Sequence, residues 1–236
     1  MRVALTLAYK GTHYLGSQIQ KESKNTIFGT FEAVLHKLGI DSKLIASGRT
    51  DKGVHATGQV CHFDLPDFWQ DLEKLKQTLN RMLPSSIQVK KIQKRSDDFH
   101  ARYHAKKRIY RYILKQGVPN PFEEELVTFR EDFTIKELKS KISLFIGEHD
   151  FKEFMKTGSD TKSSVRKFYK AFAYKHKEYT VLYFEANGFL RSQIRLMVGA
   201  LLELSEEAIL DKLHLDKEHK LKPAPSNGLY LAKIIY

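Results

Sequence analysis

The sequence predicts an α+β protein made of two similar α/β halves, each with helices packed on an antiparallel sheet. Three observations support this class. Short segments alternate apolar and polar residues, as strands with one buried face do. Longer segments between them place apolar residues at helical spacing. The order of these segments in residues 1–98 is similar in outline to their order in residues 99–236, so we take these ranges as the two domains.

The first half is expected to follow the order strand, helix, two strands, helix, strand. Asn25 or Thr26 can cap the first helix, Gly39 ends it, and Pro84 ends the second. This order is the split β-α-β layout, with helices on one face of an antiparallel sheet. The expected strands are 2–9, 44–46, 59–65 and 87–92, and the expected helices are 27–38 and 68–82.

The second half is expected to contain a strand, a helix, a hairpin, a second helix and a final strand. Thr134 and Glu137 form a capping box, which marks the start of the first of these helices. The stretch 147–154 reads as a turn with a short helix. The other expected elements are a strand over 109–114, a hairpin of 165–175 and 179–186, a helix over 190–202 and a strand over 229–236.

The net charge points to a polyanionic partner. The chain has 236 residues with 40 Lys and Arg against 28 Asp and Glu, which gives +12. Nucleic acid is the simplest partner for such a surplus. The apolar runs are too short to span a bilayer, and residues 1–7 lack the apolar core of a signal peptide. Cys61 is the one cysteine, which fits a reducing compartment, and we expect a cytoplasmic protein.

The stretch 46–56 concentrates polar chemistry between two apolar segments. Gly48 and Gly53 bracket Arg49, Thr50, Asp51 and Lys52. Glycine permits positive φ and close approach of a ligand to the backbone. Cations on both sides of Asp51 favour its ionised form. The stretch is either a solvated turn or a reactive loop, and the sequence of the loop alone does not decide between them.

Two other stretches carry side chains suited to RNA. Residues 99–116 interleave basic and aromatic residues, and alternation places Tyr110 and Tyr112 on one face of a strand with Arg111 on the other. Such a strand can grip phosphates and stack a base, or it can have an aromatic core face and a basic solvated edge. The tyrosines and glutamines of residues 9–20 can likewise contact bases or close a polar loop over the end of a sheet.

The helix over 190–202 places Arg195 among apolar residues. A cation in such a setting needs an anionic partner. That partner is either structural, for which Glu203 is a candidate, or the reactive carboxylate itself.

The remaining sites favour Asp51 as the reactive group. His100 and His104 are four residues apart but lack the glutamate of a zinc-protease helix, so no metal site is expected. Cys61 lies on an apolar strand face, where forming a thiolate is costly. No phosphate loop or dinucleotide fingerprint is present. A carboxylate can act as a nucleophile or a base without a cofactor.

Four stretches, in order along the whole chain, resemble the TruA-type tRNA pseudouridine synthases. The most specific is Gly48-Arg49-Thr50-Asp51-Lys52-Gly53-Val54-His55-Ala56, followed by Gly58-Gln59-Val60, which is similar to the catalytic motif of that family. The others are the loop 9–20, the segment Phe99-His100-Ala101-Arg102 with Lys107, Tyr110 and Tyr112, and the C-terminal motifs 188–199 and 224–229.

The resemblance implies a fold, an activity and partners. The fold is the pseudouridine synthase fold, in which the two halves share a long, mainly antiparallel sheet and the active-site cleft lies between them. The activity is isomerisation of uridine to pseudouridine in the anticodon stem-loop of tRNA, at positions 38, 39 and 40. No cofactor and no metal are implied. The partners implied are tRNA and a second copy of the chain, as a homodimer.

The resemblance also implies roles for five residues. Asp51 is the catalytic nucleophile, and Arg195 is the cation that pairs with it. Tyr110 stacks on the target uracil, Arg49 helps to displace the flipped base, and Leu229 is an apolar neighbour of that base.

The sequence departs from the family pattern at several places: the chain is short, the loop 155–164 lacks much of the usual pattern, and two motif segments differ. Ser17 stands where tryptophan is usual, and residues 191–193 replace common histidines and a methionine. We expect these changes to affect RNA contacts more than chemistry. Two other functions compete with the synthase: an RNA-binding module without catalysis, for which Asp51 would be dispensable, and a synthase that modifies other RNA uridines.

Overall fold

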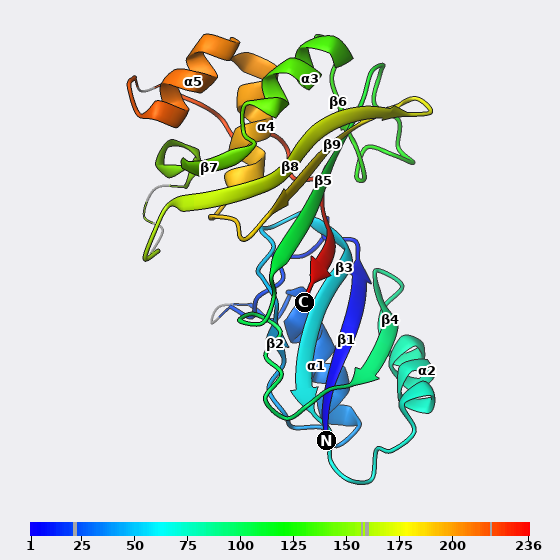
Figure 1. Ribbon diagram of the computed structural model, residues 1–236. Helices are drawn as coiled ribbons and strands as arrows, with labels where there is room; N and C mark the ends of the chain where they lie inside the picture. Colours follow the sequence, from blue (N-terminus) through cyan, green and yellow to red (C-terminus); the bar gives the residue numbers. More distant parts are fainter. Residues whose placement is uncertain (21–22, 157, 159–160, 218) are drawn as a thin grey trace. The chain divides into compact units, whose positions relative to one another are not determined.

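The computed structural model describes residues 1–20, 23–156, 158, 161–217 and 219–236, and their elements are labelled in Figure 1. The chain forms two compact units, each with strands and helices, so the predicted α+β class is confirmed. Unit 1 is Met1–Lys106 with Leu231–Tyr236, and unit 2 is Lys107–Tyr230. Strand β10 (Leu229–Ile235) therefore begins in unit 2 and ends in unit 1.

The boundary between the units differs from the expected division at residues 98 and 99. The segment 99–106 belongs to unit 1 because its apolar residues pack there. Phe99 and Ala101 form a buried cluster with Ala4 of the first strand. The hydroxyl of Tyr236 donates a hydrogen bond to the carbonyl of Ala101, over 2.8 Å. These contacts join segments far apart in the sequence, which local patterns do not reveal.

Unit 1 has the predicted order of strands and helices. Its strands follow the order β4-β1-β3-β10, and β2 pairs with β3. Strand β1 is antiparallel to both β3 and β4. The elements are β1 (Arg2–Tyr9), α1 (Ile27–Lys37), β2 (Ile45–Ala46), β3 (His55–Asp64), α2 (Leu72–Met82) and β4 (Ile87–Lys94).

The ends of both helices in unit 1 are set by local side chains. The hydroxyl of Thr26 accepts a hydrogen bond from Gly29 N, and Asp71 accepts one from Lys74 N. The expected start of the second helix at Phe68 is wrong, because Asp71 caps it three residues later. Phe68 lies before the cap and is 68% exposed. Its apolar side chain led the sequence prediction to place Phe68 inside the helix.

The core of unit 1 lies between its sheet and its helices. Leu5 and Leu7 of β1, Phe31 of α1, and Leu75 and Leu79 of α2 are all fully buried. Their spacing follows the period of two in the strand and of three to four in the helices. These side chains contribute to the core of unit 1.

Unit 2 also combines a sheet with helices. Its strands follow the order β10-β5-β9-β8-β7, and β6 pairs in parallel with β5. In Figure 1, α3, α4 and α5 lie together on one side of these strands. The elements are β5 (Lys107–Lys115), β6 (Thr128–Phe129), α3 (Ile135–Ser143), β7 (Gly147–Asp150), the 3₁₀ helix η1 (Lys152–Phe154), β8 (Val165–His176), β9 (Tyr179–Ala186), α4 (Gln193–Glu203) and α5 (Glu206–His214).

The hairpin, the short helix at η1 and the helices α3 and α4 agree with the sequence, whereas β6, β7 and α5 were not predicted. Strand β7 is only four residues long and polar, so it has no apolar alternation. Helix α5 did carry a signal: Ser205 caps it by accepting a hydrogen bond from Ala208 N. Its apolar stripe is short, with Ile209 and Leu213 as its fully or almost fully buried residues.

Phenylalanine rings form much of the core of unit 2. The rings of Phe145, Phe151 and Phe154 pack against one another, and Phe168 of β8 packs against Phe151 and Phe184. Such ring pairs add to the stabilisation that apolar burial gives. In the described part of the chain, no helix is long and apolar enough to cross a membrane.

Candidate active site

The start of the loop between β2 and β3 is hydrogen-bonded to β3, the strand that follows it. Ser47 N donates to the carbonyl of Val60, over 2.8 Å. The side chain of Gln59 accepts a hydrogen bond from the Ser47 hydroxyl and donates one to the carbonyl of Gly48, over 2.6 and 2.8 Å. Gln59 is fully buried, so the hydrogen bonds of its side-chain amide hold the start of the loop from inside the fold. The loop therefore leaves β2 at a fixed position.

A second segment, which contains Tyr9 and Ser17, is hydrogen-bonded to the loop at Thr50, the residue before Asp51. Ser17 N donates to the carbonyl of Thr50, and the Ser17 hydroxyl accepts a hydrogen bond from Thr50 N, over 3.0 and 2.9 Å. The Tyr9 hydroxyl lies 2.9 Å from the Thr50 hydroxyl. Ser17, Tyr9 and Thr50 are all buried. The residue before Asp51 is therefore held by both its backbone and its side chain.

A tight turn follows Asp51. Val54 N donates to the carbonyl of Asp51, over 3.1 Å, and Gly53 has φ of +78°. Only glycine adopts this conformation without strain. Gly11 N donates to Nδ1 of His55 over 3.1 Å, and a Cβ at Gly11 would lie 2.0 Å from the carbonyl oxygen of Val54. Gly11 is thus required for the approach of the two segments.

Asp51 lies where this loop passes from the buried part of unit 1 to the solvent. Asp51 is half-buried, while its neighbours Arg49 and Lys52 are exposed. The carboxylate is thus placed by its backbone at the surface of unit 1, with cations in the same loop. Such an arrangement suits a nucleophile or base that acts on an anionic polymer.

Tyr110 lies on β5 in unit 2. It is 9% exposed, and it is in register with Phe184 of β9. Its ring meets the ring of Phe189 edge to face, with centroids 4.9 Å apart, and Phe189 meets Phe168 in the same way at 5.4 Å. The ring of Tyr110 is held in one orientation by this contact, as a stacking surface needs to be.

Arg195 lies in the first turn and a half of α4 and is half-buried. Its Nε donates to the carbonyl of Ala224 over 2.7 Å, and Ala224 N donates to the carbonyl of Arg195 over 2.8 Å. The structural partner considered for it, Glu203, instead accepts from Arg130 over 2.8 Å. The guanidinium is thus oriented by a backbone carbonyl, which leaves its charge uncompensated by that contact.

Leu229 begins β10 and is buried. The preceding Gly228 fits only because it lacks a side chain: a Cβ there would lie 2.8 Å from the carbonyl oxygen of Ile113. Ile113 N donates to the carbonyl of Gly228 over 2.8 Å. The Tyr112 hydroxyl donates to the carbonyl of Pro225 over 2.8 Å, and burial raises the pKa of Tyr112. Leu229 is thereby fixed beside strand β5.

The candidate residues thus divide between the units. Arg49 and Asp51 share one loop of unit 1. Tyr110, Arg195 and Leu229 lie on β5, α4 and β10 of unit 2. In unit 2, backbone and ring contacts fix all three.

The structure corrects the expectation of RNA contacts for Ser17 and for Gln193, one residue of the segment 191–193. Ser17 is fully buried and bonded to Thr50, so it supports the loop of Asp51 and has no surface for RNA. Gln193 is 1% exposed, and its Nε2 is a buried donor without an acceptor in the described chain. Tyr9 and Tyr14 are also buried, so these two tyrosines of the first loop close it over the sheet.

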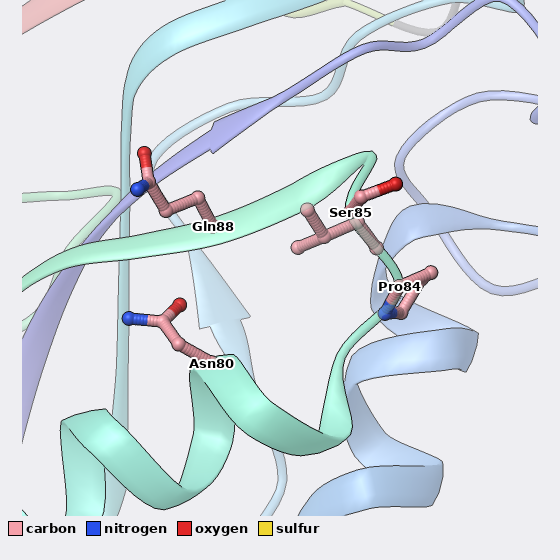
Figure 2. Close-up of a pocket in the computed structure, with 5 residues that line it drawn as sticks. Asn80, Pro84, Ser85 and Gln88 are labelled. Carbon is pink, nitrogen blue, oxygen red and sulfur yellow. The ribbon is translucent and has the colours of Figure 1, made fainter.

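A hollow on unit 1 is lined by uncharged side chains. It lies between α2 and β4, and Figure 2 shows Asn80, Pro84, Ser85 and Gln88 around it. Asn80 is engaged in the fold, because its amide exchanges two hydrogen bonds with the backbone of Val89. Within the described residues, no group of three or more His, Cys, Asp and Glu side chains could hold a metal ion.

Comparison with known proteins gives a consistent match along the chain. A family model described as tRNA pseudouridine synthase matches residues 6–104 and 142–236. A protein of Campylobacter jejuni (strain RM1221) named tRNA pseudouridine synthase A is 37% identical over 241 residues, which cover 100% of both chains. A protein of the same name from Wolinella succinogenes is 38% identical, with 98% of this chain and 92% of that one covered.

More distant bacteria give the same result. A tRNA pseudouridine synthase A of an Exiguobacterium species is 36% identical over 243 residues, covering 100% of this chain and 98% of its own. Among solved structures, a chain of a Cbf5-Nop10-Gar1 complex aligns with 97% of this chain and 48% of its own, at 11% identity and a TM-score of 0.39. That likeness is too low to bear on the fold.

Proposed function

This chain belongs to the tRNA pseudouridine synthase family, and from that premise we propose that it converts uridines of the tRNA anticodon stem-loop, at positions 38 to 40, to pseudouridine. The bond from N1 of uracil to C1′ of ribose breaks, the base turns over, and a bond from C5 to C1′ forms. N1 gains a proton and C5 loses one, so the atoms balance and the reaction is an isomerisation without a cofactor.

The observation that supports this proposal most is the setting of Asp51. Its loop is held by hydrogen bonds from Gln59 to Gly48 and between Ser17 and Thr50, and it ends in a turn that needs glycine at residue 53. A solvated turn needs none of these restraints. We assign Asp51 as the nucleophile that takes part in detaching the uracil.

The other candidate residues are assigned to the flipped base and to the carboxylate. The base has to leave its stack, which costs a few kcal/mol, and stacking on the ring of Tyr110 offsets part of that cost. The oriented guanidinium of Arg195 is assigned as the cation that pairs with Asp51. Leu229 contributes apolar surface beside the base, and the exposed Arg49 helps to displace it.

We also propose that the protein is cytoplasmic and forms a homodimer. The net charge of +12 suits the tRNA partner. An RNA-binding module without catalysis is the weaker candidate, because a carboxylate held at the surface of a basic protein would repel phosphate.

Replacing Asp51 by asparagine tests the reaction. We expect Asp51→Asn to lower pseudouridine formation in anticodon stem-loops by about 1,000-fold or more, because the amide is neither nucleophile nor base. Binding of tRNA should persist. The measurement is tritium release from uridine labelled at C5, with the dissociation constant for tRNA measured in parallel.

Asp67→Asn is the matched control, since Asp67 is an exposed carboxylate of the same unit. It should leave the rate unchanged. Full activity of Asp51→Asn would exclude the assigned nucleophile. Mapping pseudouridines in tRNA from cells with and without the protein tests the modified positions. If cells without the protein lose pseudouridine only at positions other than 38 to 40, the protein is a synthase that modifies other uridines.

A further inference from the structure

The segment Phe99–His104 in unit 1 carries a group of rings that the proposed reaction does not use. Its inner end is anchored, because Phe99 is 6% exposed and packs on the ring of Tyr236 with centroids 5.0 Å apart. Ala101 N donates to Nδ1 of His62 over 3.1 Å inside the fold. The segment is therefore a fixed part of unit 1.

The outer end of this segment is a pair of stacked rings. The rings of His100 and Tyr103 lie 4.2 Å apart between centroids and 26° from parallel. Nδ1 of His100 accepts hydrogen bonds from Arg102 N and Tyr103 N, both over 3.2 Å. These bonds need an unprotonated Nδ1, and burial together with neighbouring basic side chains lowers the pKa of His100. The stack is thus already formed at neutral pH. We call these two rings the His100–Tyr103 platform.

Tyr103 remains largely open to solvent. It is 73% exposed, although one side of its ring rests on His100. The guanidinium of Arg102 lies 5.8 Å from the centroid of the Tyr103 ring. Asp97 and Asp98 lie in the turn before the segment, where Arg2 donates hydrogen bonds to the carbonyls of Asp97 and Phe99. The platform therefore combines a largely exposed aromatic ring with a cation over it.

This combination fits an unpaired nucleotide. Bases stack on aromatic side chains whatever their identity, and an adjacent guanidinium can contact the phosphate. A ring that is held in place loses little conformational entropy when a base stacks on it. A protein surface would need a larger apolar patch than one ring pair provides.

The platform lies well away from the loop of Asp51. His62, whose ring centroid is 5.1 Å from that of His100, is at the far end of β3 from His55. Seven residues of a strand span about 23 Å. A ligand that reaches both places must therefore be about 23 Å long or more.

We propose that the His100–Tyr103 platform is a second tRNA contact, where Tyr103 stacks on an unpaired nucleotide outside the anticodon stem-loop and Arg102 contacts its phosphate. This inference rests on the proposed function for the identity of the RNA. The contact strengthens binding of whole tRNA and takes no part in the reaction.

The test compares two RNAs and three variants. Dissociation constants are measured by fluorescence anisotropy for whole tRNA and for an isolated anticodon stem-loop hairpin. We expect Tyr103→Ala to weaken binding of whole tRNA by about 5- to 100-fold, as loss of one stacked base does elsewhere. Binding of the hairpin should be unchanged. Tyr103→Phe should bind both RNAs as the unaltered protein does, because the ring suffices for stacking.

Phe68→Ala is the matched control, since Phe68 is also an exposed aromatic residue of unit 1. It should bind both RNAs normally. Unchanged binding of tRNA by Tyr103→Ala would overturn the inference, and so would equal weakening for the hairpin. Binding of neither RNA by the unaltered protein would also overturn it. If the Tyr103 variants bind the two RNAs as expected but the unaltered protein forms no pseudouridine, only the proposed function is overturned.

Discussion

At the scale of single residues, the position of Asp51 is determined by its neighbours. Thr50 exchanges two hydrogen bonds with Ser17, and its hydroxyl meets Tyr9. All of these contacts are buried, where a hydrogen bond is costly to lose. The backbone on the Thr50 side of Asp51 is thereby restrained.

We therefore predict that Ser17→Ala impairs catalysis without touching RNA. The substitution leaves Thr50 N buried without its acceptor, which costs about 1 to 3 kcal/mol of stability. It also loosens the loop, so kcat should fall while KM for tRNA stays near its normal value. Thermal unfolding and steady-state kinetics measure the two effects.

Ser85→Ala is a suitable comparison, because Ser85 is exposed and lies in the same unit. It should behave as the unaltered protein. A rise in KM with normal kcat for Ser17→Ala would instead indicate that Ser17 acts through RNA binding.

At the scale of elements, one glutamate ties a connecting segment to the sheet of unit 2. Glu123 accepts hydrogen bonds from Lys115 of β5 and from Asn120, each over 2.6 Å, and from the hydroxyl of Tyr179 of β9. These donors, Lys115 first, lower the pKa of Glu123 to about 2. This carboxylate ties the segment that joins β5 to β6 to two strands of the sheet.

This contact predicts a pH-dependent stability. The pKa of Glu123 is lower in the folded chain than its ordinary value of 4.5, so the stabilisation is complete above that value and disappears as the pH falls toward 2. Glu123→Gln should thus unfold at a lower temperature than the unaltered protein at pH 7, with the difference shrinking between pH 4.5 and 2. Calorimetry across this range measures it.

Glu124→Gln provides the control, since Glu124 is the exposed neighbour in the same segment. It should unfold at the normal temperature at every pH. A difference for Glu123→Gln that does not change with pH would show that the carboxylate charge is not what holds the segment.

The elements that were predicted from sequence are those with local signals. Thr26 and Thr134 cap helices within three residues of themselves, and both helices were found. The motif around Asp51 is likewise local, and it identified the candidate loop. The pairing of Ser17 with Thr50 spans 33 residues and has no pattern of its own. The short polar strand β7 could not be found either, because only its partner β8 defines it.

At the scale of the whole molecule, unit 1 depends on residues distant in sequence. Leu231 is fully buried and Ile234 is 7% exposed, and both belong to unit 1. A Cβ at Gly58 of β3 would lie 2.3 Å from the carbonyl oxygen of Ala232, so the two strands approach closely. Burial of these side chains contributes to a unit whose other residues end at Lys106.

We predict that Leu231→Ala destabilises unit 1. The substitution leaves a cavity in a core and should lower the free energy of unfolding by about 2 to 5 kcal/mol. Amide hydrogen exchange should accelerate in β3 and in residues 99–106. Lys233→Ala, at an exposed position of the same strand, should leave exchange unchanged. Acceleration confined to unit 2 would contradict the assignment of β10.

The path of β10 has a consequence for synthesis on the ribosome. Residues 1–106 emerge first, but the strand that completes their sheet is translated only after residues 107–230. At usual elongation rates that interval lasts roughly 6 to 25 seconds. During it, the part of the β3 edge that β10 later covers is open, since β2 pairs with β3 only at Ile45–Ala46, and this part can pair with another nascent protein. Chaperone dependence of this protein should therefore arise from its first segment, however stable the finished molecule is.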